Sequence, residues 1–185
     1  MGWAWPVLNL SANLDNRCGN TYYTAMNPTL QEELKQRQPF KSLQEEAGLN
    51  LGRTMALLGE EMERLLKPYG VSPSQYNVLR ILRGAGSEGL GRNEIRDRLV
   101  SRMPDVTRML TRLEEAGLIC RQQSGTDRRY FPTRLTDQGL SLINSLDAPI
   151  TEGQQRHFAG LTPDQLGNLI SMLTQIRANA RQQPD

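Results

Sequence analysis

Threonine and arginine recur on one face of a predicted helix near the middle of the chain. Over residues 100–121, VSRMPDVTRMLTRLEEAGLICR, the helical period brings five residues to one side: Pro104, Thr107, Arg108, Thr111 and Glu115. A guanidinium group can donate two parallel hydrogen bonds to a guanine edge, and threonine can contact a base or the methyl group of thymine. This face therefore suits contact with a nucleic acid, although most single amphipathic helices with a polar outer face are simply solvated.

The opposite face of the same stretch is apolar and predicts a helix that packs on a core. It carries Val106, Met109, Leu110, Leu113 and Gly117. Pro104 suits a first helical turn because its missing N–H needs no partner there, and Asp105 complements the positive end of the helix dipole. Gly117 predicts the end of the helix.

The neighbouring segments predict a winged helix-turn-helix around this helix. Residues 92–99 form a second short helix, which a turn at 100–103 separates from the first. Residues 118–124 and 130–135 predict two short strands, and the tip at 125–129 that joins them contains two arginines. The predicted fold class is therefore mainly α with one β-hairpin wing.

The charge of the chain is concentrated on this unit. The whole sequence has 22 Lys and Arg against 20 Asp and Glu, a formal net charge of +2. Residues 92–134 alone hold ten arginines and six acidic residues, so this unit is net positive and the remainder is net negative. A local positive excess is what a phosphate backbone attracts, although a chance excess of this size is also conceivable.

The rest of the chain predicts helices on both sides of the winged unit. Residues 40–67 predict a long helix. The capping box Ser72 to Gln75 opens a second helix, which runs through residue 83 and is expected to bury Tyr76, Leu79 and Leu82. Residues 84–91 predict a flexible turn. Before them, residues 30–37 predict a short helix. After the wing, a helix that begins at residues 136–139 buries Leu140, Ile143 and Leu146, and Pro149 and Gly153 kink or divide it. A second capping box at residues 162–165 opens a final helix.

These segments predict a single folded domain with a terminal extension. The expected division is 1–39 as a disordered or loosely ordered extension, 40–178 as the domain, 72–135 as its winged-helix lobe, 40–70 and 136–178 as dimerisation helices, and 179–185 as a flexible tail. Either Met1 or Met26 can be the start of the natural chain.

The first and last long helices carry wide apolar stripes that a small winged helix cannot cover alone. The predicted dimerisation residues are Leu51, Met55, Leu58, Leu166, Leu169, Ile170, Leu173 and Ile176. A homodimer would bury both stripes. The alternative is that the two helices pack on each other within a monomer.

Little in the sequence supports enzyme chemistry. The single histidine, His157, has no cysteine or second histidine at ligand spacing, so it is expected to be a surface or packing residue. The adjacent carboxylates Glu60 and Glu61 do not face each other on a helix and are expected to be solvated. Cys18 and Cys120 have no paired spacing, which argues against a disulfide framework or a zinc site and favours a reducing cytoplasm. We expect no cofactor, no metal and no membrane segment.

At these residues the chain resembles the MarR family (multiple antibiotic resistance regulators), which are cytoplasmic, dimeric winged-helix transcription factors. The resemblance covers about residues 40–178. Its most specific parts are PDVTRMLTRLEEAGLICR, which matches the recognition helix and the next strand of the family, and DRRYFPTRLTDQG, which matches the wing and the start of the following helix. Residues 72–76 match the usual opening of the helix before the DNA-binding unit.

The chain departs from the family pattern at two places. Ser124 or Gly125 stands where members usually have a further aspartate ahead of the wing arginines. Residues 103–105, Met-Pro-Asp, stand where many members have small hydroxyl residues, so a base preference cannot be transferred.

The resemblance implies a role for each basic element. Thr107, Arg108 and Thr111 would face the major groove, whereas Arg128 and Arg129, oriented by Asp127, would reach a flanking minor groove or its phosphates. The full set of expected DNA-binding residues is Arg102, Pro104, Asp105, Thr107, Arg108, Thr111, Arg112, Asp127, Arg128 and Arg129.

The expected function is that of a homodimeric, sequence-specific regulator that binds an inverted-repeat operator in double-stranded DNA. The resemblance further implies a repressor that is released by a small anionic aromatic or other lipophilic effector, bound between the dimer helices and the DNA-binding lobe. Two alternatives stay open. One is a winged-helix dimerisation or protein-interaction module without DNA binding, and the other is a thiol-based redox regulator.

Overall fold

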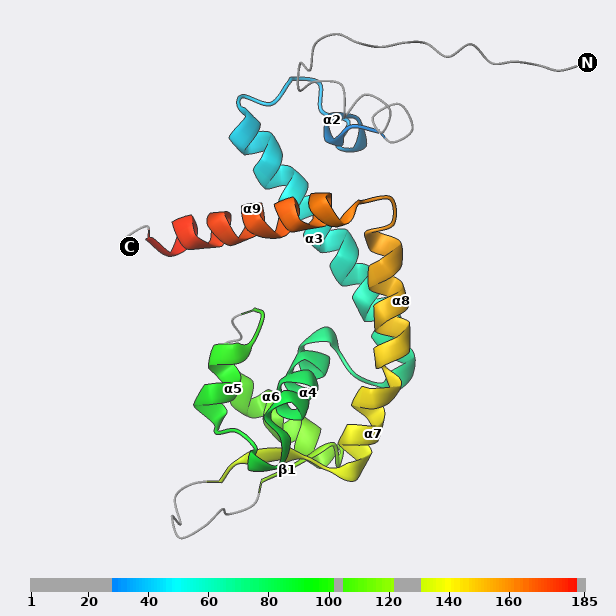
Figure 1. Cartoon of the computed structure of the whole chain (residues 1–185), viewed down its shortest axis with the longest axis vertical. Coiled ribbons are helices and arrows are strands. Elements are labelled where there is room, and N and C mark those ends of the chain that lie inside the picture. Colours follow the sequence, from blue (N-terminus) through cyan, green and yellow to red (C-terminus); the bar gives the residue numbers. More distant parts are fainter. Residues whose placement is uncertain (1–27, 102–104, 122–130, 183–185) are drawn as a thin grey trace, which may run out of the picture. The chain divides into compact units, whose positions relative to one another are not determined.

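The computed structural model describes residues 28–101, 105–121 and 131–182, and most of these residues are helical (Figure 1). The chain divides into two compact units, residues 1–58 and 59–185. Strands β1 (Ile119–Arg121) and β2 (Thr133–Leu135) form a two-stranded antiparallel sheet. The predicted fold class is therefore confirmed.

The first unit contains α2 (Leu30–Glu33) and the first part of α3 (Leu43–Leu66). Thr29 and Glu32 form a capping box at the start of α2, and Leu30 at its first position is buried. The helix predicted over residues 30–37 is shorter because Lys35 has a left-handed backbone (φ 50°), which ends the helix. The range 1–39, predicted to be disordered or loosely ordered, thus contains one ordered helical turn.

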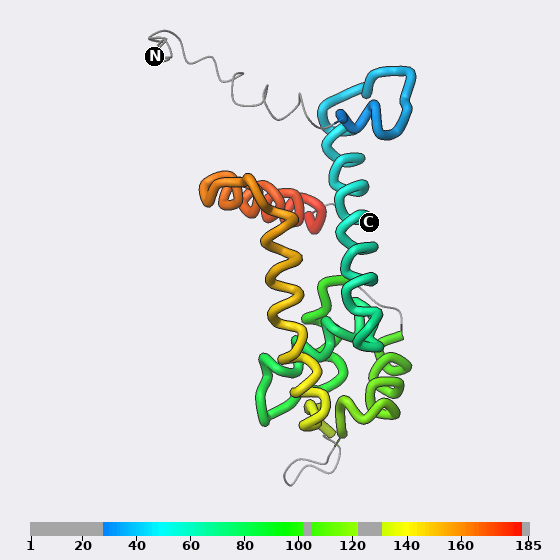
Figure 2. Tube along the Cα trace, turned by 90° about the vertical axis from the view of Figure 1, so that its right-hand side faces the viewer, coloured from blue at the N-terminus to red at the C-terminus, as the bar shows by residue number. Residues whose placement is uncertain are grey.

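The second unit contains the remaining elements. They are η1 (Lys67–Tyr69), α4 (Pro73–Ala85), η2 (Gly86–Glu88), α5 (Arg92–Arg98), α6 (Val106–Glu115), the two strands, α7 (Asp137–Ser145), α8 (Asp147–His157) and α9 (Pro163–Gln182). Figure 2 shows the end of α3 and α8 running side by side, and Gly153 of α8 lies against the Leu65 side chain of α3.

The core of this unit contains side chains from the helices α3 to α8 and from β1, and α9 contributes no buried residue. Its most deeply buried side chains are Leu66, Val78, Leu79, Leu82, Ile95, Leu110, Leu113, Ile119, Ile143 and Leu146. The predicted capping box of α4 is confirmed, because Ser72 Oγ accepts from the N–H of Gln75 while Gln75 Oε1 accepts from the N–H of Ser72. Tyr76, predicted to be buried with Leu79 and Leu82, is only half-buried.

The connection predicted to be a flexible turn at 84–91 is an ordered part of the fold. Helix α4 continues to Ala85, η2 follows, and Leu90 forms an antiparallel bridge with Thr133 of β2 through two backbone hydrogen bonds of 3.0 and 2.8 Å. Leu90 is buried, so it adds an apolar contact at the base of the hairpin. Leu118, Phe131 and Pro132, predicted to be strand residues, lie outside β1 and β2. The other predicted strand residues beyond these bounds, 122–124 and 130, lie outside the described part of the chain.

The helical segment after the hairpin breaks at a different place from the one predicted. The break falls at Leu146, between α7 and α8, and Pro149 and Gly153 both lie within α8. Pro149 fits because it is in the first turn, where its missing N–H leaves no helical bond unmade. Leu140, predicted to be buried, is 42 % exposed. The inward positions are 139, 142, 143 and 146, so Gly139 takes the place expected for Leu140.

Within the described residues, the structure has no helix that is both long enough and apolar enough to cross a membrane.

Candidate nucleic-acid interface

Helix α6 presents a polar face to solvent and an apolar face to the core. Thr107, Arg108, Thr111 and Arg112 are exposed, as predicted. The opposite face is buried through Val106, Met109, Leu110 and Leu113. Because four buried side chains hold a helix of only ten residues, its outer face is set rigidly on the protein.

The helix begins later than the sequence predicts. Its first residue is Val106, and Asp105 is the N-cap, with Oδ1 accepting from the N–H of Arg108 at 2.9 Å. Asp105 therefore secures the start of α6 through a capping hydrogen bond, in addition to favouring the helix dipole. Arg102 and Pro104 lie outside the described residues. Gly117, with φ 71°, ends the helix as predicted.

Helix α5 precedes α6 in the chain and packs against it. Ile95 is completely buried in the core, and Arg92 at the first position of α5 reaches across to α6, with Nη1 3.5 Å from Oγ1 of Thr107. Arg92 was not among the residues predicted for this site. Its position at the start of the shorter helix could have indicated the contact with α6, because a long side chain there can reach the next helix.

A shallow cavity of about 360 Å³ adjoins the outer face of α6. It is lined by Ser72, Ser74 and Gln75 from the start of α4 and by Asp105, Arg108, Met109 and Arg112. Hydroxyl groups, an amide and two guanidinium groups are the donors that bind phosphate oxygens in proteins. Ser72 and Ser74 were not among the residues predicted to bind DNA, because residues 72–76 were assigned from the sequence to the opening of a helix.

The base of the hairpin is fixed tightly to α7. Thr136 Oγ1 donates to the carbonyl of Gly117 at 2.6 Å and accepts from the N–H of Gly139 at 3.1 Å. A Cβ on Gly139 would lie 2.0 Å from the carbonyl oxygen of Leu118, so only glycine fits there. These contacts join the end of α6 to the start of α7. The predicted wing-tip residues Asp127, Arg128 and Arg129 lie outside the described residues.

Comparison with known proteins identifies the class of this unit. Residues 71–131 match the model of the MarR family. A crystal structure of a MarR transcription factor from Planctomyces limnophilus is 36% identical, with a TM-score of 0.56, and the match covers 74% of this chain and 98% of that one. The chain belongs to the MarR family. It is therefore a transcription regulator of the DNA-binding winged-helix class.

Two further similarities extend over most of this MarR-family chain. The HTH-type transcriptional repressor IacR of Pseudomonas putida is 29% identical over 171 residues, which covers 92% of this chain and 95% of the relative. The crystal structure of the S. aureus MepR–DNA complex has the same fold, with a TM-score of 0.64 at 23% identity, and the match covers 70% of this chain and 96% of that one.

The predicted dimerisation residues of this MarR-family chain lie in both units. On α9, Ile170 and Ile176 are 63% and 52% exposed, Leu166, Leu169 and Leu173 are half-buried, and no residue of the helix is fully buried. The capping box predicted at residues 162–165 opens this helix. On α3 in the first unit, Met55 is 65% exposed, while Leu51 and Leu58 are half-buried.

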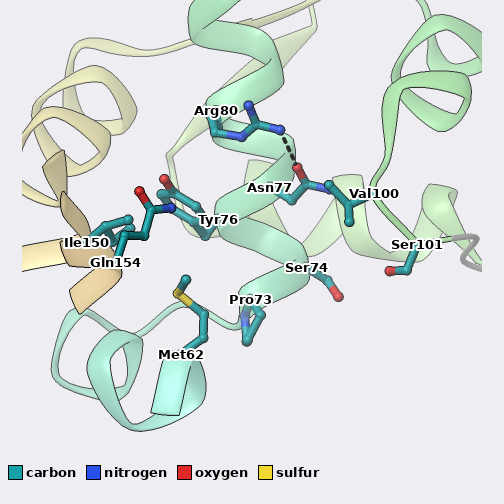
Figure 3. Close-up of a pocket in the computed structure, with 10 residues that line it drawn as sticks. All are labelled: Met62, Pro73, Ser74, Tyr76, Asn77, Arg80, Val100, Ser101, Ile150 and Gln154. Atoms are coloured by element: carbon teal, nitrogen blue, oxygen red, sulfur yellow. Dashed lines mark hydrogen bonds between the residues drawn. The ribbon is translucent and has the colours of Figure 1, made fainter. Parts of the chain in front are cut away.

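A second cavity, of about 400 Å³, lies beside α4 (Figure 3). Its lining comes from the end of α3 (Met62), α4 (Pro73, Ser74, Tyr76, Asn77, Arg80), the residues after α5 (Val100, Ser101) and α8 (Ile150, Gln154). Arg80 donates from Nη2 to Asn77 Oδ1 at 3.1 Å. Burial raises the pKa of the Tyr76 phenol above its ordinary value. An apolar and aromatic wall with one guanidinium group suits an organic anion.

His157, expected to be a surface or packing residue, is partly buried and contacts Glu61, so Glu61 is not freely solvated as expected. His157 Nε2 lies 2.6 Å from Glu61 Oε2, and Arg156 Nη2 lies 3.8 Å from Glu61 Oε1. The hydrogen bond from His157 lowers the pKa of Glu61 below its usual 4.5, and the positive charge of Arg156 acts in the same direction. The contact joins α3 to α8, which the sequence did not predict because the two residues are far apart in the chain.

Two further observations concern the expected absence of a metal and the alternative of a thiol-based redox regulator. Among the residues that the structure describes, no group of three or more His, Cys, Asp or Glu side chains is placed to hold a metal ion. Cys120 is a free, half-buried cysteine in β1, and Cys18 lies outside the described residues.

Proposed function

We propose that this chain is a homodimeric repressor that binds an inverted-repeat operator in double-stranded DNA and releases it when a small anionic aromatic ligand binds. The observation that carries the proposal is the outer face of α6, where Thr107, Arg108 and Thr111 are exposed on a helix fixed by four buried side chains. Such a face can enter a major groove and contact base edges without first becoming ordered.

The relatives support both DNA binding and repression. MepR, which shares this fold, was crystallised with DNA, and IacR, which is similar over most of its length, is named a transcriptional repressor. Because a regulator of this kind must meet chromosomal DNA, we place its action in the cytoplasm.

Dimerisation follows from the exposed apolar residues of α9. Ile170, Met172 and Ile176 are each more than half exposed in the single chain, and large exposed apolar side chains on a helix favour burial against another surface. A two-fold dimer carries two copies of α6, so its site should be an inverted repeat with half-sites about one helical turn apart.

The effector would bind in the cavity beside α4 shown in Figure 3. Tyr76, Met62 and Ile150 supply apolar surface, and Arg80 supplies the charge that a carboxylate requires. The cavity is bounded on one side by residues just before α6 and on the other by α8, so a ligand there would contact the reading lobe and a helix outside it.

Footprinting on the DNA upstream of the gene first locates the operator. The test then compares three proteins, wild type, Arg108→Ala and the double variant Arg128→Ala/Arg129→Ala, for binding to this operator and to a scrambled duplex. Losing Arg108 should reduce operator preference by about 1–3 kcal/mol for each bidentate interaction removed. Losing the two wing arginines should weaken binding to both duplexes and flatten the salt dependence by about one unit for each phosphate that is no longer neutralised.

The matched control is Arg64→Ala, which removes the same charge from an exposed position on α3, outside the winged helix. An Arg108→Ala variant with undiminished operator preference would remove α6 from the interface. A wing variant with unchanged affinity and salt slope would remove the wing.

A further inference from the structure

The two threonines on the outer face of α6 use their hydroxyl groups differently. Thr107 and Thr111 lie one helical turn apart and are both exposed on the face that carries Arg108. A threonine hydroxyl has one proton to donate and two lone pairs that accept, so its contacts within the protein decide what it can offer to a base.

The proton of the Thr111 hydroxyl is already used within the helix. Thr111 Oγ1 donates to the backbone carbonyl of Thr107 at 3.1 Å, the bond that threonine commonly makes to the carbonyl four residues earlier. This bond also restricts the rotation of the side chain. The lone pairs and the methyl group of Thr111 are therefore what remain for an outside partner.

Thr107 is the second residue of α6, and the hydrogen bond of its hydroxyl group is to a side chain outside this helix. Its Oγ1 lies 3.5 Å from Nη1 of Arg92 on α5. A guanidinium group only donates, so the oxygen of Thr107 accepts and its proton is left for an outside partner.

We propose that Thr107 and Thr111 read opposite hydrogen-bonding groups on the operator, Thr107 as a donor and Thr111 as an acceptor. Thr107 would contact N7 of a purine, O6 of guanine or O4 of thymine, and Thr111 would contact the amino group of adenine or cytosine or the methyl group of thymine. Arg92 acts as a positioning residue for Thr107. This inference rests on the proposed DNA-binding function and assigns the chemistry of its reading face.

The test combines protein variants with base analogues in double-mutant cycles. A duplex is first selected by wild type from a random pool, and its half-sites are then resynthesised one base at a time. Three analogues remove an acceptor: 7-deazapurines lack N7, 2-aminopurine in place of guanine lacks O6, and 5-methyl-2-pyrimidinone in place of thymine lacks O4. Two remove an amino donor, namely purine in place of adenine and 2-pyrimidinone in place of cytosine. Deoxyuridine lacks the thymine methyl group. Affinities are measured for wild type, Thr107→Val and Thr111→Val.

We expect Thr107→Val to couple to an acceptor-deleting analogue, so that the analogue weakens wild type about fivefold or more but hardly affects the variant. Thr111→Val should couple to amino deletion. If Thr111 instead touches a thymine methyl, Thr111→Ser should couple to deoxyuridine. Coupling of Thr107 to amino deletion, of Thr111 to acceptor deletion, or of neither residue to any analogue would overturn the assignment.

Arg92 is tested through the same cycles. Arg92→Ala should reduce the coupling between Thr107 and its analogue at least twofold and leave the coupling of Thr111 unchanged. The control is Arg96→Ala, which removes an equal charge from α5, where Arg96 binds Asp97. This control should change neither coupling. If both arginine variants reduced the couplings equally, Arg92 would contribute only its positive charge and would not position Thr107. If wild type selects no sequence from the pool, the proposed function itself fails, whereas a selected site with reversed couplings would refute only the polarity assignment.

Discussion

Arg83 binds Asp147 with both ends of its guanidinium group, Nη1 lying 2.8 Å from Oδ2 and Nη2 lying 2.8 Å from Oδ1. The same Nη1 lies 3.1 Å from Asn144 Oδ1. These contacts connect the last turn of α4 to the junction of α7 and α8, so one side chain ties the winged helix to the helices that follow it. The bidentate geometry sets the angle between the partners as well as their separation.

The pH dependence of stability should reveal this contact. Hydrogen bonding to Arg83 lowers the pKa of Asp147 below its ordinary 3.8, so the folded chain favours the carboxylate. The stabilisation is fully present above the unfolded value and disappears as the pH falls through the folded one. We expect Asp147→Asn to be less stable than wild type at neutral pH, with the difference closing below about pH 4.

Urea unfolding followed by circular dichroism from neutral to acid pH measures that difference. Glu152→Gln removes an exposed carboxylate from the same helix and serves as the control for the removal of charge. A gap between wild type and Asp147→Asn that stays constant down to about pH 2 would show that the ion pair does not contribute.

Gly139→Ala should destabilise the fold strongly. The added Cβ would lie 2.0 Å from the backbone carbonyl oxygen of Leu118, which cannot move without shifting the connection between α6 and β1. Overpacking costs about 1–3 kcal/mol and occasionally more, and an approach of 2.0 Å to backbone places this variant at the upper end. The matched control is Gly84→Ala in α4, where a Cβ meets nothing within 4 Å and which should be neutral or stabilising by up to about 1 kcal/mol. Denaturant titration of both variants checks this, and equal stabilities would contradict it.

Replacing Ile170 and Ile176 with glutamate should dissociate the proposed dimer while leaving each chain folded. Both side chains are more than half exposed in the single chain, so the charges would be buried only at a subunit interface. Sedimentation at micromolar concentration should show dimeric wild type and a monomeric variant with unchanged helix content. Gln175→Glu places one charge on the opposite face of α9 and should remain dimeric. Wild type that sediments as a monomer would refute the dimer.

Arg80→Gln should weaken binding of an anionic aromatic ligand but preserve DNA binding. The loss of a charged hydrogen bond to a carboxylate corresponds to about tenfold in affinity. With 1-naphthoate as the probe, calorimetry should report this weakening, and the concentration that releases operator DNA should rise in parallel. Arg64→Gln, a change outside the cavity lining, is the control. Equal responses of wild type and Arg80→Gln would exclude this cavity as the effector site.

Local sequence determined the helices, their caps and the polarity of α6. The capping boxes at Ser72 and Thr162, the glycine that ends α6 and the separation of Thr107 and Arg108 from Val106 and Leu110 could all be predicted. Each depends on residues within a few positions of one another, and the helical period relates sequence to direction directly.

Only the tertiary structure decided which residues meet across the fold. Leu90 pairs with Thr133, Arg83 with Asp147, Glu61 with His157 and Arg92 with Thr107. The inward turn of Gly139, in place of Leu140, has the same origin, since the backbone of Leu118 occupies the space that a side chain would need. Such pairings depend on how distant segments pack, and residue type and spacing within one segment carry no information about the partner that another segment brings.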